Sequence, residues 1–242
     1  QKHLAKEGRI VIAIENKYGL KYFAGCKEDH LGDWFSGIEN YPNGGVVRTF
    51  SRKKLEKIFD ACGVGERSFY YPYPDYKFMT TVYSDAYLPG RGELSNNLRN
   101  FDRDRMLLFD EKSAFDGIVE EGLFSVFSNS YMAIIGKPLE LKYARYSNDR
   151  AEEFRIRTEI LTDTEGKKTV RKYPLTTEAE AHVRHMAEAY EKLKKRYAGS
   201  RLDVNTCHLG EEEGAIYAEF EFVPGRPLSE LMDECLDRQD VE

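Results

Sequence analysis

The sequence predicts an α+β protein in which helices and strands are mixed in two domains. Its 242 residues are 41% hydrophobic and 32% charged, which is enough for one large or two small globular domains. Runs with strand-like and helix-like periodicity occur in both halves. The segment Gly136-Lys137-Pro138 separates an apolar strand from a charged, alternating segment. We therefore expect domains at residues 1–138 and 139–242.

The charge balance gives no overall positive field. With 36 Lys and Arg against 42 Asp and Glu, the formal net charge is −6, so nothing attracts the whole molecule to nucleic acid or an anionic membrane. The longest apolar runs, residues 10–14 and 131–135, are far shorter than the ~20 residues that span a bilayer. The four cysteines stand singly, as is typical of a reducing compartment. We expect a cytoplasmic protein that binds no nucleic acid and does not insert into a membrane.

The first half predicts a strand, a loop, a helix and another strand, then a long insert and a final strand. Residues 9–14 form a continuous β-branched run, which predicts a strand buried on both faces, as in a parallel sheet. Residues 15–49 have no clear period. Ser51 is expected to cap an amphipathic helix that ends at Gly63 or Gly65.

The remaining strands of the first half are expected at residues 68–73 and 123–135. The polar excursion between them predicts a short helix near residues 102–109. The aromatic run at residues 69–76 has two interpretations: a platform on which sugars stack, or core packing with edge protection by its prolines. We favour core packing.

The second half predicts three antiparallel strands, a helix, two strands and a final helix. Residues 139–146 and 153–161 alternate in polarity, and residues 169–173 form the third strand after a turn at Glu165-Gly166. Residues 178–198 have helical spacing, with Lys and Arg crowding the last turn and Gly199 at the end. Residues 215–222 predict a strand, and the turn at residues 224–227 leads into the last helix.

Three features of the first half occur together in one known family. Residues 7–14 match a helix end, a glycine and a fifth strand, residues 50–63 match a following helix, and residues 68–73 and 123–136 match an antiparallel pair that closes the sheet. Residues 1–136 therefore resemble the C-terminal portion of a class I S-adenosylmethionine-dependent methyltransferase. Within that family, Ile14-Glu-Asn-Lys-Tyr-Gly-Leu-Lys-Tyr22 and Glu28-Asp-His-Leu-Gly32 are similar to methyltransferase modules of bacterial surface-glycan and lipopolysaccharide biosynthesis proteins.

This resemblance implies methyl transfer from S-adenosylmethionine to a sugar or glycan hydroxyl. The glycine-rich turn and the acidic residue that hold the cofactor in this family would lie upstream of Gln1, so we expect the S-adenosylmethionine site to be outside this chain. The chain would then be a piece of a longer polypeptide. We expect its open sheet edge to be satisfied by self-association or by the missing segments.

The second half carries a different set of ordered features. Val170-Arg-Lys172 lies in the third strand, Glu180 follows in the next helix, and Tyr217-Ala-Glu-Phe-Glu-Phe-Val-Pro-Gly-Arg-Pro-Leu228 forms a strand and turn. This half is similar to the N-terminal lobe of the protein-kinase and aminoglycoside-phosphotransferase superfamily. The resemblance implies that Lys172 binds nucleotide phosphates and pairs with Glu180, and that Glu221 to Val223 offer backbone groups to adenine, which makes ATP a candidate ligand.

Two departures limit what this half can do alone. Residues 146–153 contain no GxGxxG, and the aspartates of the catalytic loop and of the metal site would lie downstream. We therefore expect no phosphoryl transfer from this chain. The sequence predicts a fragment of a bifunctional enzyme of bacterial surface-glycan biosynthesis; the alternative is a non-catalytic interaction module with two degenerate halves.

The candidate site residues of the first half follow its strands. Asp29 and His30 lie in the loop after the first strand, where α/β sheets bind ligands. A histidine beside a carboxylate can act as general base on a sugar hydroxyl, and the alternative is a surface pair that stabilises the loop. Asn16, at the mouth of the strand, and Asp75, within the aromatic run, are candidates for substrate contact.

A zinc site is considered and rejected. His182 and His185 are spaced by one helical turn, and Cys207-His208 follows. Val183 and Met186 define the buried face of that helix, which places the histidines on its flank. We identify no metal site. Lys172 and Glu180 likewise have a structural alternative, an exposed ion pair of little energetic value.

Overall fold

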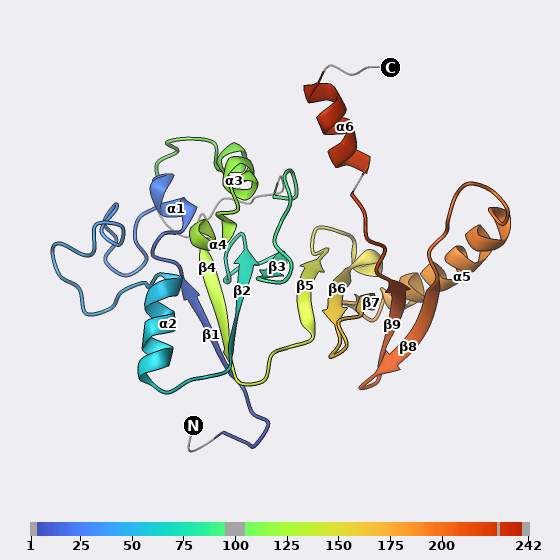
Figure 1. Ribbon diagram of the computed structural model, residues 1–242, viewed down its shortest axis with the longest axis horizontal. Coiled ribbons are helices and arrows are strands. Elements are labelled where there is room, and N and C mark those ends of the chain that lie inside the picture. Colours follow the sequence, from blue (N-terminus) through green and yellow to red (C-terminus); the bar gives the residue numbers. More distant parts are fainter. Residues whose placement is uncertain (1–3, 95–104, 227, 239–242) are drawn as a thin grey trace. The chain divides into compact units, whose positions relative to one another are not determined.

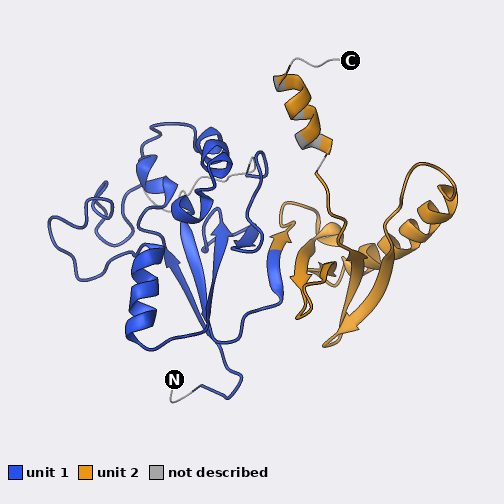
Figure 2. Cartoon of the chain, in the orientation of Figure 1, with its two compact units in different colours: residues 1–143 blue, residues 144–242 orange. Residues whose placement is uncertain are grey.

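The chain forms two compact units, residues 1–143 and 144–242 (Figure 2). A computed structural model describes residues 4–94, 105–226 and 228–238 of it (Figure 1). In each unit the paired strands are antiparallel and helices accompany them, which confirms the broad α+β class. In the described part of the chain, none of the helices has the length and apolar character needed to cross a bilayer.

The boundary between the units falls after Tyr143 rather than at residue 138. The Tyr143 ring packs on Tyr83 and Tyr87, with centroid distances of 5.5 and 4.8 Å. The Tyr70 hydroxyl donates a hydrogen bond of 2.8 Å to the carbonyl of Leu141. These contacts hold the first residues of β5 (Leu141–Tyr146) in the first unit.

Four strands of the first unit lie side by side. Their order is β1 (Ile10–Glu15), β4 (Ser130–Ile135), β2 (Arg67–Tyr73) and β3 (Thr81–Ser84), and each neighbouring pair is antiparallel. The register places Ile14 opposite Tyr131 and Phe69 opposite Ala133. The strands expected at residues 68–73 and in the last part of 123–135 therefore do form an antiparallel pair.

The expectation that the first strand is buried on both faces is wrong. Along β1 the side chains alternate, and Val11 is 59% exposed, whereas Ile12 and Ile14 pack against the core. β1 is the edge strand of this sheet among the described residues, and β4 is its antiparallel neighbour. A strand that is covered on a single face requires apolar side chains only at alternate positions. The continuous apolar run therefore predicts more burial than β1 has.

The helix expected after Ser51 is confirmed. The Ser51 side chain accepts a hydrogen bond of 3.3 Å from the amide of Lys54 at the start of α2 (Arg52–Ala61). Leu55 and Phe59 are the buried residues of this helix. Gly63 follows the helix with φ of 70°, the left-handed conformation that favours glycine after a helix end.

Several expected helix and strand positions in the first unit are wrong. Residues 123–135 are not one strand, because α4 (Phe124–Phe127) precedes β4. The short α1 (Leu20–Phe23) and the longer α3 (Glu111–Glu120) have no counterpart in the sequence-based expectation. Residues 105–109 of the expected helix near 102–109 are not helical, and the rest of it lies outside the described residues.

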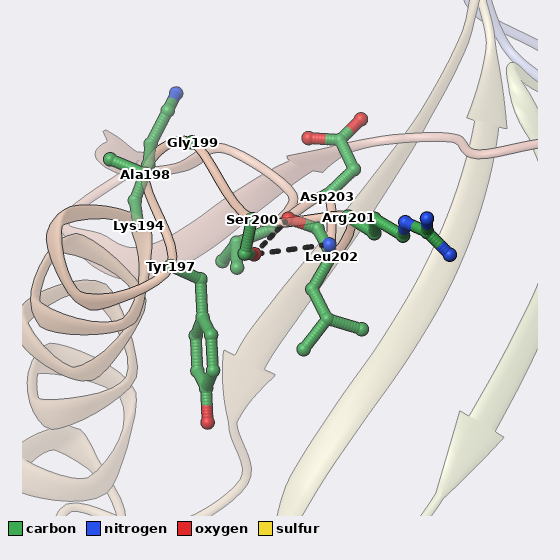
Figure 3. Close-up of a pocket in the computed structure, with 9 residues that line it drawn as sticks. Lys194, Tyr197, Ala198, Gly199, Ser200, Arg201, Leu202 and Asp203 are labelled. Carbon is green, nitrogen blue, oxygen red and sulfur yellow. Dashed lines mark hydrogen bonds between the residues drawn. The ribbon is translucent and has the colours of Figure 1, made fainter.

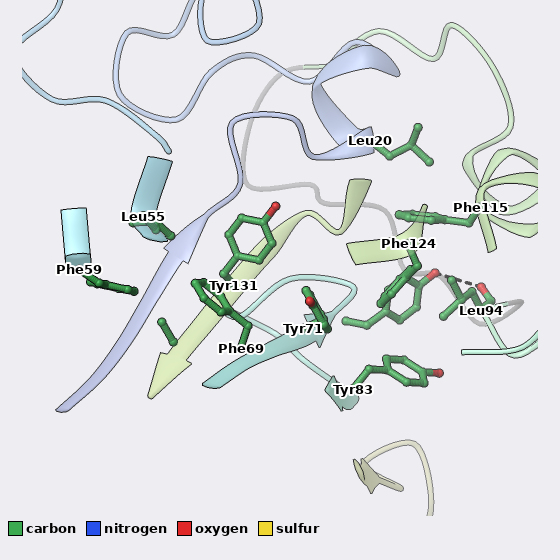
Figure 4. Close-up of a cluster of buried hydrophobic side chains, with 12 residues drawn as sticks. Leu20, Leu55, Phe59, Phe69, Tyr71, Tyr83, Leu94, Phe115, Phe124 and Tyr131 are labelled. Atoms are coloured by element: carbon green, nitrogen blue, oxygen red, sulfur yellow. Dashed lines mark hydrogen bonds between the residues drawn. The ribbon is translucent and has the colours of Figure 1, made fainter. Parts of the chain in front are cut away.

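The first unit has an aromatic core (Figure 4). Phe69, Tyr71 and Tyr73 of β2 are at most 4% exposed, and Tyr71 packs edge-on against Tyr131 at a centroid distance of 6.1 Å. Phe124, from α4, contacts the rings of Tyr71 and Tyr83. The interpretation of the aromatic run as core is confirmed for these residues.

The second unit places a long helix on an antiparallel sheet. The strand order is β6 (Ile156–Thr162), β7 (Lys168–Pro174), β9 (Ala215–Glu221) and β8 (Cys207–Glu212), and α5 (Glu180–Arg196) packs on β7, β8 and β9. A single 3₁₀ turn (Glu152–Phe154) precedes β6, and α6 (Leu228–Asp237) follows β9. Val183 of α5, fully buried, joins Phe220 and Ala218 in a separate core.

Candidate functional site

The ends of β1 and β2 bring charged side chains together in the first unit. Glu15 is the last residue of β1, and Asp75 follows β2. Lys21 belongs to α1, and Asp29 lies in the loop after that helix. With Lys77, which follows Asp75, these residues form a cluster that we call the charged network.

Lys21 is the centre of the charged network. Its Nζ lies 2.8 Å from Asp75 Oδ2 and 3.3 Å from Asp29 Oδ2, and the three side chains are 0%, 0% and 3% exposed. Burial lowers the pKa of Lys21, but the two carboxylates raise it by more, so the net pKa lies above its ordinary value. Lys21 therefore stays charged, and its removal would leave two buried carboxylates without their main cation.

Asp29 is held in its ionised form. Burial raises the pKa of Asp29, but Lys21, Lys77 and the Tyr22 hydroxyl together lower it to about 2. Lys77 Nζ lies 2.8 Å from Asp29 Oδ1, and Tyr22 donates to Asp29 Oδ2. A carboxylate with so low a pKa accepts hydrogen bonds well but is a weak general base near neutral pH.

The outer part of the charged network faces solvent. Lys77 Nζ also lies 3.0 Å from Glu15 Oε1, and the Tyr76 hydroxyl donates to the same oxygen at 3.1 Å. Glu15 is nearly buried at 5% exposed, whereas the side chain of Lys77 is 31% exposed. Lys77 is thus the partly exposed member that joins the Asp29 and Glu15 carboxylates.

Asn16 has a structural role in this arrangement. It is 0% exposed, and its Nδ2 donates hydrogen bonds of 2.7 Å to the carbonyls of Val126 and Ser128. Its Oδ1 accepts from the amide of Tyr18 at 3.0 Å. The side chain joins the end of β1 to α4 and the residue after it, and its polar atoms are occupied by the backbone rather than directed at a substrate.

His30 and Asp29 do not form the pair that a general base requires. The contacts of Asp29 described above are to Lys21, Lys77 and Tyr22. His30 is exposed, and its backbone amide donates a hydrogen bond of 2.7 Å to Glu28 Oε2. The imidazole is therefore exposed to solvent, and Asp29 does not orient it.

Sequence reasoning missed three members of the charged network: Glu15, Lys21 and Lys77. It selected Asp29 and Asp75, which the fold brings to the same ammonium group across 46 positions of sequence, 75 − 29. The sequence signal for these cations was a lysine in each of the segments that follow β1 and β2. Lysine is common on surfaces, so that signal alone does not distinguish a buried cation.

In the second unit, Lys172 lies on the helix-covered face of the sheet. In β7 it is opposite the buried Ala218, and its Nζ lies 5.4 Å from the centre of the Phe220 ring. Burial, and then the charge of Arg150, lower the pKa of Lys172. The prediction that Lys172 pairs with Glu180 is wrong. Among the described residues these two side chains form no ion pair, and the lysine packs on an aromatic ring instead.

The predicted adenine-binding residues lie at the end of β9. Glu221 is the last residue of the strand, and its carbonyl accepts a hydrogen bond of 2.9 Å from Asn205 Nδ2. Val223 is 67% exposed. The Glu221 carbonyl thus already has a partner within the unit, whereas Val223 is open to solvent.

The second unit also contains a pocket away from the predicted site residues. A pocket of about 400 Å³ lies in the loop after α5, where Ser200 Oγ accepts from the amide of Leu202 at 3.1 Å (Figure 3). It contains none of the predicted site residues. Within the described ranges, no group of three or more His, Cys, Asp or Glu side chains is placed to hold a metal ion.

Comparison with known proteins gave no match: no protein-family model, no curated protein and no solved structure is similar to this chain.

Proposed function

We propose that residues 1–143 bind the sugar or glycan acceptor of a methyl transfer from S-adenosylmethionine, within an enzyme of bacterial surface-glycan biosynthesis. The observation that carries the proposal is the charged network at the end of β1, where buried carboxylates meet a partly exposed lysine. The element order supports it as well, because β1, α2 and the antiparallel pair of β2 and β4 follow each other as the methyltransferase resemblance implies.

The chemistry of the network suits a hydroxyl-bearing ligand. Sugar hydroxyls donate hydrogen bonds, and the buried Asp29 and Glu15 carboxylates, which share the partly exposed Lys77, are strong acceptors. The ligand would take the positions that Lys77 Nζ occupies in this structure. Asp29, with its lowered pKa, then orients the acceptor, and the exposed His30 is the group suited to accept the hydroxyl proton.

The described residues do not fit the cofactor itself. The mouth of β1 is occupied by Asn16, whose side chain is fully bonded to backbone, and by the ion-paired Glu15. The proposal is therefore limited to acceptor binding, and we expect calorimetry to find weak or no S-adenosylmethionine binding to this chain.

The acceptor proposal is tested by saturation-transfer NMR with methyl glycosides of common hexoses. We expect a signal with the native chain and its loss in Asp29→Asn, which keeps the shape but removes the charge. Lys57→Gln, on the exposed side of α2, is the control and should leave the signal unchanged. An equal signal in Asp29→Asn and the native chain would refute the assignment of the network to acceptor binding.

For residues 144–242 we propose a kinase-like lobe that has a structural rather than a phosphoryl-transfer role. The order of β7, α5, β8, β9 and the following turn supports the resemblance. The packing of Lys172 on Phe220 favours the second candidate function, a non-catalytic interaction module. Titration with ATP tests this: we expect no saturable binding, and ATP binding that Lys172→Ala abolishes would restore the nucleotide role.

A further inference from the structure

A second pocket of about 400 Å³ lies in the first unit, where the segment after β1, the loop before α2 and the start of α2 meet. Three of its lining side chains are cationic, Lys17, Arg48 and Lys54, and none is acidic. Tyr18 and Phe50 add aromatic surface. Its volume falls in the ~300 to 1,000 Å³ range of small-molecule sites.

The three cations have no acidic partner. Among the described residues, none of them forms an ion pair with a carboxylate. Lys17 Nζ donates to the amide oxygen of Asn40, and Arg48 Nε donates to the carbonyl of Gly45 at 2.9 Å. Three like charges around one pocket repel each other, although the whole chain has a net charge of −6. An anion in the pocket would relieve that repulsion.

The wall of the pocket is built at an energetic cost. Asn40 and Tyr41 have φ angles of 63° and 58°, in the left-handed region that is costly for a bulky residue such as tyrosine. Tyr41 is nonetheless 6% exposed, and its hydroxyl contacts Glu28 Oε1 at 3.0 Å and Thr49 Oγ1 at 2.7 Å. The Arg48 guanidinium lies 5.2 Å from the centre of the Tyr41 ring. The strained backbone thus places a fixed aromatic support beneath one of the cations.

We propose that this pocket binds the phosphate group of a small phosphorylated molecule. Arg48 offers a planar set of donors that matches phosphate oxygens, and the two lysines supply further positive charge. Tyr18 and Phe50 supply a surface on which the ring of a phosphorylated sugar can pack. The inference does not depend on the methyl-transfer proposal, because it concerns other residues and another chemical group.

The test is an NMR titration of the chain with inorganic phosphate, glucose 1-phosphate and glucose. Both phosphate compounds should bind and shift the backbone amides of Asn40, Tyr41 and Thr49, and glucose should not. Arg48→Gln and Lys54→Gln are exposed changes, and each should weaken binding by roughly tenfold, the loss of one charge-assisted hydrogen bond. Tighter binding of glucose 1-phosphate than of phosphate would identify the sugar phosphate as the better ligand for the same site.

The matched control is Lys53→Gln with Lys57→Gln. Both lysines are exposed on α2 but do not line the pocket, so this variant loses the same type of charge from the same helix. It should bind within about twofold of the native chain, since distant surface charges are screened. The proposal is overturned if the control loses as much affinity as the pocket variants, if the shifted amides lie outside the pocket, or if neither phosphate compound binds at roughly 10 mM.

Discussion

Replacement of Lys21 by methionine should destabilise the first unit strongly. The lysine is fully buried and its Nζ lies 2.8 Å from Asp75 and 3.3 Å from Asp29, so Lys21→Met leaves both carboxylates in a low-dielectric site without their shared cation. Removal of one partner from a buried ion pair costs about 3 to 5 kcal/mol. Asp29 retains Lys77 and Tyr22, so most of the loss should come from Asp75. The double variant Lys21→Met/Asp75→Asn should recover most of it.

Urea denaturation measures this loss in the relevant unit. Trp34 is the only tryptophan, it lies in the first unit, and its indole donates to the carbonyl of Gly25 at 3.2 Å, so its fluorescence reports that unit alone. Lys53→Met, an exposed change on α2, is the control and should alter the free energy of unfolding by less than about 0.5 kcal/mol. A cost below about 1 kcal/mol for Lys21→Met would refute the interpretation of the network as a buried ion cluster.

The pH dependence provides an independent check. The pKa of Asp29 is lowered to about 2 from 3.8, so its ionised form adds stability above about pH 4, on the order of 2 kcal/mol, which is lost as the pH falls through the folded value. Lys21 is the strongest of the groups that lower this pKa. The difference between the native chain and Lys21→Met should therefore be largest near pH 7 and shrink toward about pH 3. A constant difference would contradict the electrostatic origin of the effect.

Three further variants test other parts of the fold. Lys172→Met should stabilise the second unit near pH 7, because burial lowers the pKa of the lysine from 10.5 and so makes its charge unfavourable. In urea titrations this gain in the free energy of unfolding should shrink as the pH rises toward 10.5. A destabilised variant would contradict the unfavourable burial of the charge. Gly25→Ala should lower the free energy of unfolding by about 1 to 3 kcal/mol, because φ of this residue is 101° and the new Cβ would lie 2.7 Å from Met106 Cβ. An unchanged urea midpoint would show that the loop adjusts freely. The native chain should associate through the open edge of β1, and Val11→Lys should reduce its mass in light scattering, unless the native chain is already a monomer at every concentration.

Local sequence signals predicted the elements whose structure depends on their own residues. The Ser51 cap and the apolar positions of α2 are encoded within a few positions, as are the strand residues of β7 and β9, and each of these elements forms where expected. The double burial of β1 could not be judged in this way, because it depends on what lies on each face of the strand. The helical turn of α4 was also missed, since its apolar residues continue directly into β4 and carry no polar stop signal.

The candidate site was predicted only in part, for a related reason. Asp29 was selected because it follows a strand, which is a local property, and Asp75 was selected as a member of the aromatic run. Their shared partner Lys21 is set by the register of β2 and β4 and by the Asn129 side chain, which accepts from the amide of Lys21 at 2.9 Å and donates to the carbonyl of Pro74 at 3.0 Å. Contacts that join residues more than fifty positions apart leave no periodic trace in one sequence.

The two charged sites of the first unit are joined through Glu28 and Asp29. Glu28 is 1% exposed, accepts from the amides of His30 and Leu31 at 2.7 and 2.8 Å, and binds the hydroxyl of Tyr41, which forms a wall of the cationic pocket. Its neighbour Asp29 is bound into the charged network. One short segment therefore connects the charged network, for which we propose hydroxyl binding, with the pocket for which we propose phosphate binding. A ligand that carries both hydroxyl and phosphate groups would find complementary charge at both sites, whereas an unphosphorylated sugar would use only the first.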